Sequence, residues 1–174
     1  MGLYDGHLSR ERDLQLVGRG KEVWIRRGIL TLLTAFVLLG MLDFFGQGSQ
    51  HSEAAGSKAS LTLDAPNRLR GGLVFEGRFD ITATDSLQHP TLRLAPGWTT
   101  GMSLNTIEPA PASEKSRDGD LYLEFDPLPA GSRLTVWTQW QVNPVNTGTR
   151  AQDVELLDGS THLAAIDRDV TVFP

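Results

Sequence analysis

The residues of this chain that are best able to do chemistry are its histidines and one short acidic run. The histidines share no spacing that would gather the three or four ligands of a zinc site, and they are His7, His51, His89 and His162. Asp118-Gly119-Asp120, with Glu114 before it, could offer oxygen atoms to calcium, but a calcium loop usually has more such ligands at alternate positions. The competing interpretation, a hairpin turn at Asp118-Gly119, is the one we expect.

Sequence motifs for a nucleophile or a metal are also absent. No Gly-x-Ser-x-Gly or His-Glu-x-x-His stretch occurs, and the sequence contains no cysteine. Without cysteine, disulfide bonds, thiolate metal sites and cysteine catalysis are excluded. We therefore expect a protein that is not an enzyme, with no catalytic residues, no cofactor and no metal.

Two tryptophans are better candidates for a binding surface. Trp137 shares the polar face of a predicted strand with Gln139, whereas Trp140 falls on the apolar face, and Trp98 lies in a Pro-Gly-Trp loop. An exposed indole can stack on a sugar or anchor a protein interface. The alternative for Trp137 is that a loop folds over it.

A polar loop is predicted directly after this strand, from Asn143 to Arg150. Such a loop can bind a partner or can simply connect two strands. Together with the tryptophans, it defines the candidate interaction surface, which consists of Trp98, Trp137, Gln139, Asn143, Asn146 and Arg150.

Charge is unevenly distributed along the chain. The sequence has 16 Lys and Arg against 21 Asp and Glu, but residues 1–27 carry a net charge of +2 and residues 60–174 a net charge of −6. Nucleic acid and anionic lipid are bound through basic faces that release counterions. The large acidic segment is therefore a poor candidate for binding either of them.

One segment is apolar enough to cross a membrane. From Gly28 to Phe45, eighteen residues carry a single charge, Asp43, near their far end. A helix of this length is ~27 Å long, close to the ~30 Å hydrocarbon thickness of a bilayer. A core helix of a soluble domain would show a polar stripe, and only Thr31 and Thr34 interrupt this one. We predict a transmembrane helix over residues 28–45, with ends marked by Trp24, Arg26, Arg27 and Asp43.

The flanking charges predict the orientation of this helix. Basic residues crowd its amino side, whereas the first basic residue on the carboxyl side is Lys58. By the positive-inside bias, the amino terminus is cytoplasmic and everything after Phe45 is exported. Because cysteine and Asn-x-Ser/Thr sites are both absent, we expect the cytoplasmic membrane of a bacterium.

A cleaved signal peptide is the alternative to an anchor. Ser57-Lys58-Ala59 has the small-x-small form of a cleavage site, and Gly46-Gln47-Gly48 is a poorer version of it. However, Ala59 lies fourteen residues beyond Phe45, and 27 residues precede the apolar run. That run is also longer than the usual ~7–15 residues of a signal peptide, so we expect it to be retained as an anchor.

The segments on either side of the apolar run differ in composition. Residues 1–27 are too few and too polar to hold a core, and we expect a solvated cytoplasmic tail, with a docking helix after Ser9 as the alternative. Residues 46–60, GQGSQHSEAAGSKAS, lack aliphatic bulk and periodicity, which predicts a flexible linker. Its root-mean-square reach of roughly 20 Å would keep any partner of the exported domain near the bilayer.

Residues 61–174 have the two-residue period of β-strands. In the clearest case, Phe75, Phe79, Ile81 and Ala83 alternate with polar side chains. The eight predicted strands are 61–64, 75–84, 91–95, 102–107, 121–125, 133–142, 152–157 and 162–173. Asp-Gly and Pro-Gly pairs supply the turns between them, and no convincing helix occurs, which predicts an antiparallel β-sandwich.

One stretch narrows the fold further. FDPLPAGSRLTVWTQWQV, residues 125–142, resembles the turn and strand of bacterial immunoglobulin-like surface domains, and with RFDITATDSLQHPTLRLAPGW the resemblance covers most of residues 61–174. It implies an all-β, immunoglobulin-like sandwich of seven or eight strands, displayed at a surface, and it implies no activity.

These observations predict a single-pass membrane protein that displays an immunoglobulin-like domain outside the cytoplasmic membrane. Its expected partner, besides the bilayer, is another membrane or envelope protein, for which it would be an accessory or assembly subunit. The alternative function is a module that binds glycan or peptidoglycan through Trp98 and Trp137. Nucleic acid is not an expected partner.

Overall fold

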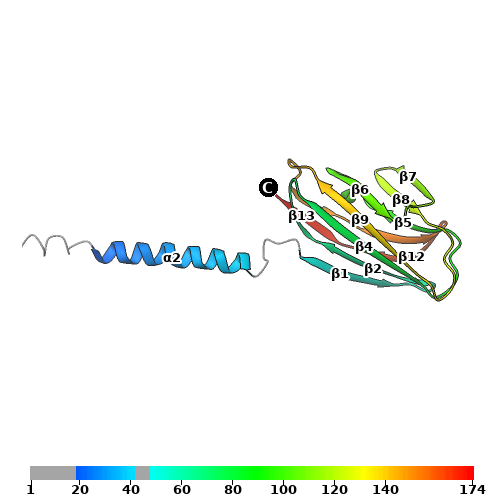
Figure 1. Cartoon of the computed structure of the whole chain (residues 1–174), viewed down its shortest axis with the longest axis horizontal. Helices are drawn as coiled ribbons and strands as arrows, with labels where there is room; N and C mark the ends of the chain where they lie inside the picture. The colour runs from blue at the N-terminus through cyan, green and yellow to red at the C-terminus, as the bar shows by residue number, and fades with distance from the viewer. Residues whose placement is uncertain (1–18, 42–47) are drawn as a thin grey trace, which may run out of the picture. The chain divides into compact units, whose positions relative to one another are not determined.

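The computed structural model describes residues 19–41 and 48–174, with side chains from Lys21 onwards in the first range. The chain divides between Phe45 and Gly46 into two compact units, and each is described by itself (Figure 1). Predictions that concern residues 1–18 and 42–47, including Asp43 and the end of the predicted membrane span, lie outside the described residues.

The first unit contains helix α2, Arg19–Met41, which begins well before the predicted start at Gly28. Its described side chains, from Lys21 to Met41, are all exposed although most are apolar. Thr34 donates its hydroxyl to the Leu30 carbonyl at 2.8 Å, so this polar group is satisfied within the helix. By length and composition α2 could cross a membrane, a test that a signal sequence near the N-terminus would also pass.

The second unit is built from two five-stranded antiparallel sheets and one smaller sheet (Figure 1). The first sheet, in spatial order, is β1 (Ser49–Ala55), β2 (Ala59–Pro66), β4 (Val74–Ala83), β9 (Arg133–Val142) and β6 (Met102–Glu108). The second sheet is β12 (Thr161–Ile166), β11 (Val154–Asp158), β5 (Pro90–Leu94), β8 (Asp120–Glu124) and β7 (Ser113–Arg117). The third is β10 (Gly148–Ala151), β13 (Asp169–Phe173) and β3 (Arg68–Arg70), in which β13 and β3 pair in parallel.

A single hydrophobic core lies between the two large sheets. Phe79, Ile81 and Val136 come from the first sheet, Leu92 and Leu156 from the second, and all belong to one cluster of fully buried side chains. The predicted all-β sandwich is therefore confirmed, and the alternation predicted for residues 133–142 is found in β9, where Val136, Thr138, Trp140 and Val142 are buried.

The turn chemistry predicted at Asp118-Gly119 is also confirmed. Asp118 and Gly119 connect β7 to β8 with φ angles of 55° and 90°. Two consecutive positive φ angles are typical of the tight hairpin turns that Asp-Gly favours. Asp120, the last residue of the acidic run that could have offered oxygen atoms to calcium, accepts a hydrogen bond from Arg93 Nε at 2.7 Å.

The structure contains more strands than the seven or eight predicted, because the described residues form thirteen. The predicted strand over 162–173 is two strands, β12 and β13, which belong to different sheets. The remaining additions, β1, β3, β7 and β10, are short or lie at sheet edges, where polar side chains obscure the apolar alternation.

The predicted flexible linker over residues 46–60 is wrong where the structure describes it. Seven of its residues form β1, which pairs along its whole length with β2, from Ser49 opposite Pro66 to Ala55 opposite Ser60. Small polar residues suffice here because an edge strand needs to contact the core on one face only, as Ala54 does. Consequently the chain between the end of α2 and the first strand is only residues 42–48.

A glycine substitution distinguishes this hairpin from a linker. Gly56 lies in the turn between β1 and β2, and a Cβ atom there would overlap with the carbonyl oxygen of Leu163. We expect Gly56→Ala to lower the free energy of unfolding by about 1–3 kcal/mol, the usual cost of overpacking. Chemical denaturation of the full chain in detergent, followed by tryptophan fluorescence, measures the change.

Ser57→Ala is the matched control, because Ser57 is exposed in the same turn. We expect its denaturation midpoint to equal that of the unmodified chain. If Gly56→Ala also left the midpoint unchanged, residues 49–60 would behave as a linker and the pairing of β1 with β2 would be contradicted.

Candidate functional site

The outer face of the first sheet carries a row of polar and aromatic side chains that crosses all five strands. Strand register places His51 opposite Asp64, Asp64 opposite Arg78, Arg78 opposite Trp137, and Trp137 opposite Glu108. Cross-strand neighbours on one face of an antiparallel sheet lie close enough for their side chains to interact. This row is the core of the candidate site.

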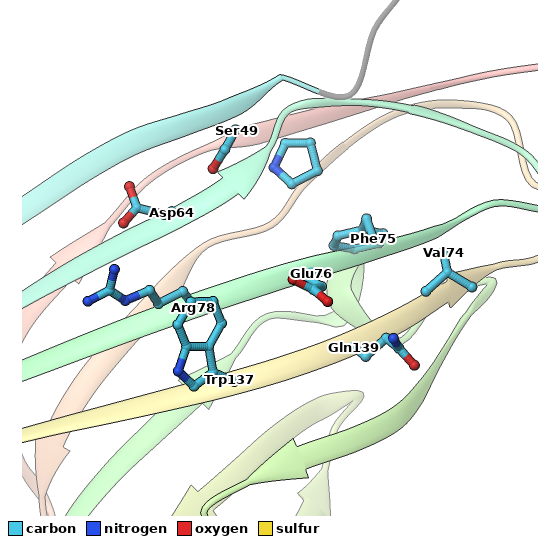
Figure 2. A pocket seen from close by; sticks show the side chains of 9 residues that line it. Ser49, Asp64, Val74, Phe75, Glu76, Arg78, Trp137 and Gln139 are labelled. Atoms are coloured by element: carbon cyan, nitrogen blue, oxygen red, sulfur yellow. The ribbon is translucent and has the colours of Figure 1, made fainter.

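A groove of about 530 Å³ runs along the row on the side of β1 and β2. Figure 2 shows its lining, in which Arg78 and Trp137 lie next to each other on adjacent strands. The side chains that line it are Ser49, Asp64, Pro66, Val74, Phe75, Glu76, Arg78, Trp137 and Gln139. The groove is thus a mixed polar and aromatic surface.

Trp137 is the exposed aromatic residue of this face, as the sequence predicted. Its side chain is 48% exposed, and the Arg78 guanidinium carbon lies 5.1 Å from the centroid of its ring. With half of the indole open to solvent, the alternative raised from the sequence, a loop folded over it, is wrong. A cation held over an indole is attracted by the electron density of the ring and restricts its rotation, so Trp137 presents a pre-positioned apolar surface.

Arg78 is in turn held by a buried carboxylate. Asp80 is only 3% exposed although it lies on the outer face, and its Oδ2 atom is 3.0 Å from Arg78 Nη2 and 2.8 Å from Arg133 Nη2. Thr135 donates its hydroxyl to Oδ1 of the same carboxylate. Asp80 therefore positions Arg78, and through Arg78 it positions the indole.

The environment of Asp80 lowers its pKa. Burial by itself raises the pKa of this carboxyl, but hydrogen bonds from Thr135 and Arg133 and the positive charges of Arg78 and Arg133 outweigh burial, so the pKa lies below its usual value. Asp80 is consequently ionised at neutral pH, and the ion pairs around it are intact there.

A second groove, of about 460 Å³, lies on the other side of Trp137, towards β6. Glu76 and Glu108 both line it, together with Thr106 and Gln139. Gln139 therefore contributes to both grooves, as does Trp137. The predicted pair Trp137 and Gln139 is thus brought together by the structure.

The prediction that Trp98 belongs to an exposed surface is wrong, because its side chain is fully buried. The 3₁₀ turn Pro96–Trp98 brings Gly97 so close to Ala151 that a Cβ atom would overlap with the Ala151 carbonyl oxygen. This close approach places the Trp98 indole in the core, where its ring centroid is 5.4 Å from that of Trp140. Trp98 Nε1 donates to the Gln152 carbonyl at 3.0 Å, which satisfies its polar group.

The loop residues predicted to belong to the same surface form hydrogen bonds with backbone groups of their own loop or of a neighbouring turn. Asn146 Nδ2 donates to the Gly101 carbonyl at 3.0 Å, and Arg150 Nη1 donates to the Thr100 carbonyl at 2.7 Å. Asn143 Oδ1 accepts from the backbone N–H of Val145. Asn143, Asn146 and Arg150 therefore hold the connection between β9 and β10 in place, and they do not line the grooves beside Trp137.

The described histidines lie in separate places. His51 Nδ1 is 2.7 Å from Asp64 Oδ1, His89 Nδ1 is 2.9 Å from Glu124 Oε1, and His162 is exposed on β12. Within residues 19–41 and 48–174, no three His, Asp or Glu side chains converge as metal ligands.

Several members of the site could not have been found from the sequence. Arg78, Asp64 and Glu108 have no local feature that distinguishes them from other surface charges. Only the register between strands far apart in the sequence brings them beside Trp137. The polar alternation around Trp137 was the one signal available.

The sheet arrangement defines the class of fold as an immunoglobulin-like β-sandwich that follows one apolar helix. No family model matches the chain, and no curated protein was found to match it. The class therefore rests on the topology described above.

Solved structures of low similarity include several small β domains. The CARDB domain of a Pyrococcus furiosus protein, solved with two metal ions, is 12% identical, with a TM-score of 0.43, and the match covers 68% of this chain and 92% of that one. A cupredoxin domain from Nitrosocaldus yellowstonii is 10% identical, with a TM-score of 0.44 and coverages of 69% and 90%. A cohesin from Archaeoglobus fulgidus is 7% identical, with a TM-score of 0.38 and coverages of 73% and 92%. At these scores the likenesses carry nothing about ligands or function.

The role of Asp80 can be tested through the pH dependence of stability. Because its pKa is lowered in the folded state, the stabilisation it supplies is present above the unfolded pKa of ~3.9 and is lost as the pH falls through the folded value. We expect Asp80→Asn to lower the free energy of unfolding at pH 7 by about 1–3 kcal/mol, as for hydrogen bonds to charged groups. We also expect it to flatten the loss of stability in acid.

Asp126→Asn is the control, because Asp126 is exposed. Denaturation midpoints are measured at several pH values from neutral to acid. In this control, the midpoint should fall with decreasing pH as it does in the unmodified chain. Equal slopes for the two variants would contradict the assignment of Asp80.

Proposed function

We propose that this chain is a non-enzymatic, single-pass membrane protein that displays its immunoglobulin-like domain at the outer face of a bacterial cytoplasmic membrane. In this proposal the domain contacts another membrane or envelope protein, as an accessory or assembly subunit. The observation that carries the proposal is Trp137, an indole 48% exposed on a largely polar sheet face and held there by Arg78.

The membrane anchor is supported by α2 and by the hairpin of β1 and β2. Arg26 and Arg27 precede the apolar run on its amino side, which under the positive-inside bias places that side in the cytoplasm. The alternative cleavage site, Ser57-Lys58-Ala59, lies in the hairpin between β1 and β2. Cleavage after Ala59 would remove β1, which pairs with β2 over its whole length, so cleavage at that site is disfavoured. The poorer candidate, Gly46-Gln47-Gly48, precedes β1, and against it stand the 27-residue leader and the length of the apolar run.

A protein interface is the use that best fits the face around Trp137. Tryptophan and arginine are the residue types enriched among those that dominate binding energy at interfaces. Here they are stacked on each other and flanked by Glu76 and Gln139. The two adjoining grooves are partly open to solvent, as suits side chains from a partner more than an enclosed substrate.

The glycan-binding alternative loses one of the two indoles on which it was based. Trp98 is buried between the sheets and cannot stack on a sugar. Trp137 alone remains, with Asp64 and Gln139 nearby as groups that could bind hydroxyls. A protein partner therefore remains the primary proposal.

The partner can be captured by photo-crosslinking from the face around Trp137. We expect a photoreactive amino acid at position 137 of the full chain, expressed in cells, to give a discrete crosslinked species of higher mass. The same group at Lys115, which is exposed on the edge strand β7 of the other sheet, is the control and should give far less of that species.

Recovery of the free monomer only, or equal crosslinking from both positions, would contradict the protein interface. A change in Trp137 fluorescence on titration with peptidoglycan fragments, absent in Trp137→Phe, would support the glycan alternative instead.

A further inference from the structure

Exposed apolar side chains of the β domain gather at one of its ends. Outside helix α2, the described chain has five large hydrophobic residues classed as exposed, and one of them is Trp137. The other four are Leu73, Val74, Val145 and Phe173. Val145 is 85% exposed, which is unusual for a valine in a folded domain.

Backbone hydrogen bonds bring these four residues together from three segments of the chain. The N–H of Gly72 donates to the Val142 carbonyl at 3.0 Å, and the N–H of Val142 donates to the Leu73 carbonyl at 2.9 Å. The N–H of Gly71 donates to the Phe173 carbonyl at 2.9 Å. The turn before β4, the loop after β9 and the end of β13 thus form one surface, which we call the apolar tip.

The apolar tip lies at the end of the domain where the chain arrives from helix α2. Ser49, the first residue of β1, is opposite Pro66, and β3 follows at once and pairs with β13 up to Phe173. Figure 1 shows the carboxyl terminus at the end of the sandwich where β1 and β4 begin and β9 ends. Eight Cα-to-Cα steps separate Met41 from Ser49, which limits the connection to about 29 Å even when fully extended.

The charge of the tip differs from that of the domain. Residues 60–174 carry fifteen acidic side chains, and none falls in the segments 65–75, 140–151 and 170–174 that build the tip, although Glu76, which lines a groove together with Val74, lies at its border. The same segments contain Arg68 and Arg70, and also Arg150, whose guanidinium donates to the carbonyls of Thr100 and Thr147. Arg68 and Arg70 are exposed on β3, where Arg70 is directly opposite Phe173. The acidic average of the domain therefore conceals a basic, apolar end.

We propose that the apolar tip lies on the surface of the lipid bilayer, with Leu73, Val74, Val145 and Phe173 in the interface. This inference rests on the proposed function, because it takes α2 as the membrane anchor. Apolar side chains flanked by basic ones are the combination that binds an anionic membrane surface, since burial of apolar area and attraction to anionic headgroups add together. The short connection to α2 holds the tip within reach of that surface.

Lipid is a better occupant of the tip than a soluble partner for two reasons. The first is connectivity, because β1, the strand that follows α2 after residues 42–48, begins at this end of the domain. The second is charge complementarity. Arg68 and Arg70 attract anionic headgroups, and no acidic residue falls in the tip segments.

The absence of cysteine allows a site-specific test on the full chain. Single cysteines at Val145, at Ser160 and at Leu33 are labelled with an environment-sensitive fluorophore, and the protein is placed in nanodiscs. The nanodiscs contain phosphatidylglycerol and a lipid with a nitroxide quencher just below its headgroup. Ser160 is the control at the other end of the domain, in the exposed turn between β11 and β12, and Leu33 reports on the helix.

We expect severalfold stronger quenching of the label at position 145 than at position 160. Arg70→Glu should reduce the quenching at 145 in nanodiscs with phosphatidylglycerol and change it much less in nanodiscs of phosphatidylcholine alone. Arg117→Glu, an exposed arginine on β7, is the matched charge control and should leave it unchanged.

The outcomes separate this inference from the proposed function. Strong quenching at 33 with equal, weak quenching at 145 and 160 would overturn the contact of the tip with lipid and leave the anchor intact. Weak quenching at 33 would overturn the anchor and the inference together. A label at 145 that reports an apolar environment without being quenched would show that protein covers the tip, which also overturns the inference.

Discussion

The antiparallel register between β4 and β9 is the constraint on which both faces of the β domain depend. On the inner face it places Phe79 opposite Val136 and Phe75 opposite Trp140, which are core contacts. On the outer face the same register places Arg78 opposite Trp137 and Asp80 opposite Thr135. Because side chains alternate with a period of two, a slip of one residue would expose the core and bury the charges.

The buried carboxylate of Asp80 shows how a sheet face becomes a defined surface. A lone ionised carboxylate that is 3% exposed would be unfavourable. Two arginines and one threonine hydroxyl compensate for its burial, and one of those arginines stacks on Trp137. The exposed indole is thus connected to the interior of the sheet by a short chain of charged contacts.

Local patterns in the sequence were enough to predict most central strands, the Asp118-Gly119 hairpin and the two faces of β9. They failed where the outcome depends on contacts between distant segments. Trp98 follows a Pro-Gly pair that normally marks an exposed turn, yet the fit of Gly97 against Ala151 turns the indole inward. The composition of β1 predicts a linker because an edge strand needs little apolar alternation.

Strand β1 shortens the connection between helix α2 and the β domain. A linker of fifteen residues would let the domain sample many orientations, whereas the chain between Met41 and Ser49 is much shorter. This short connection and the basic, apolar tip at the end of the sandwich where β1 begins are the observations from which the contact of the tip with lipid is inferred.

The central claim is that α2 is retained as an anchor and that the β domain lies outside the cytoplasmic membrane. The most direct measurement is labelling of single cysteines in spheroplasts with a thiol reagent that cannot cross membranes, with one cysteine at Ser9 and another at Ser160. We predict that the full-length chain is found in the membrane fraction and is labelled at 160 in intact spheroplasts, but at 9 only after lysis. Labelling at 9 in intact spheroplasts, or a shortened chain released from the membrane, would contradict the account.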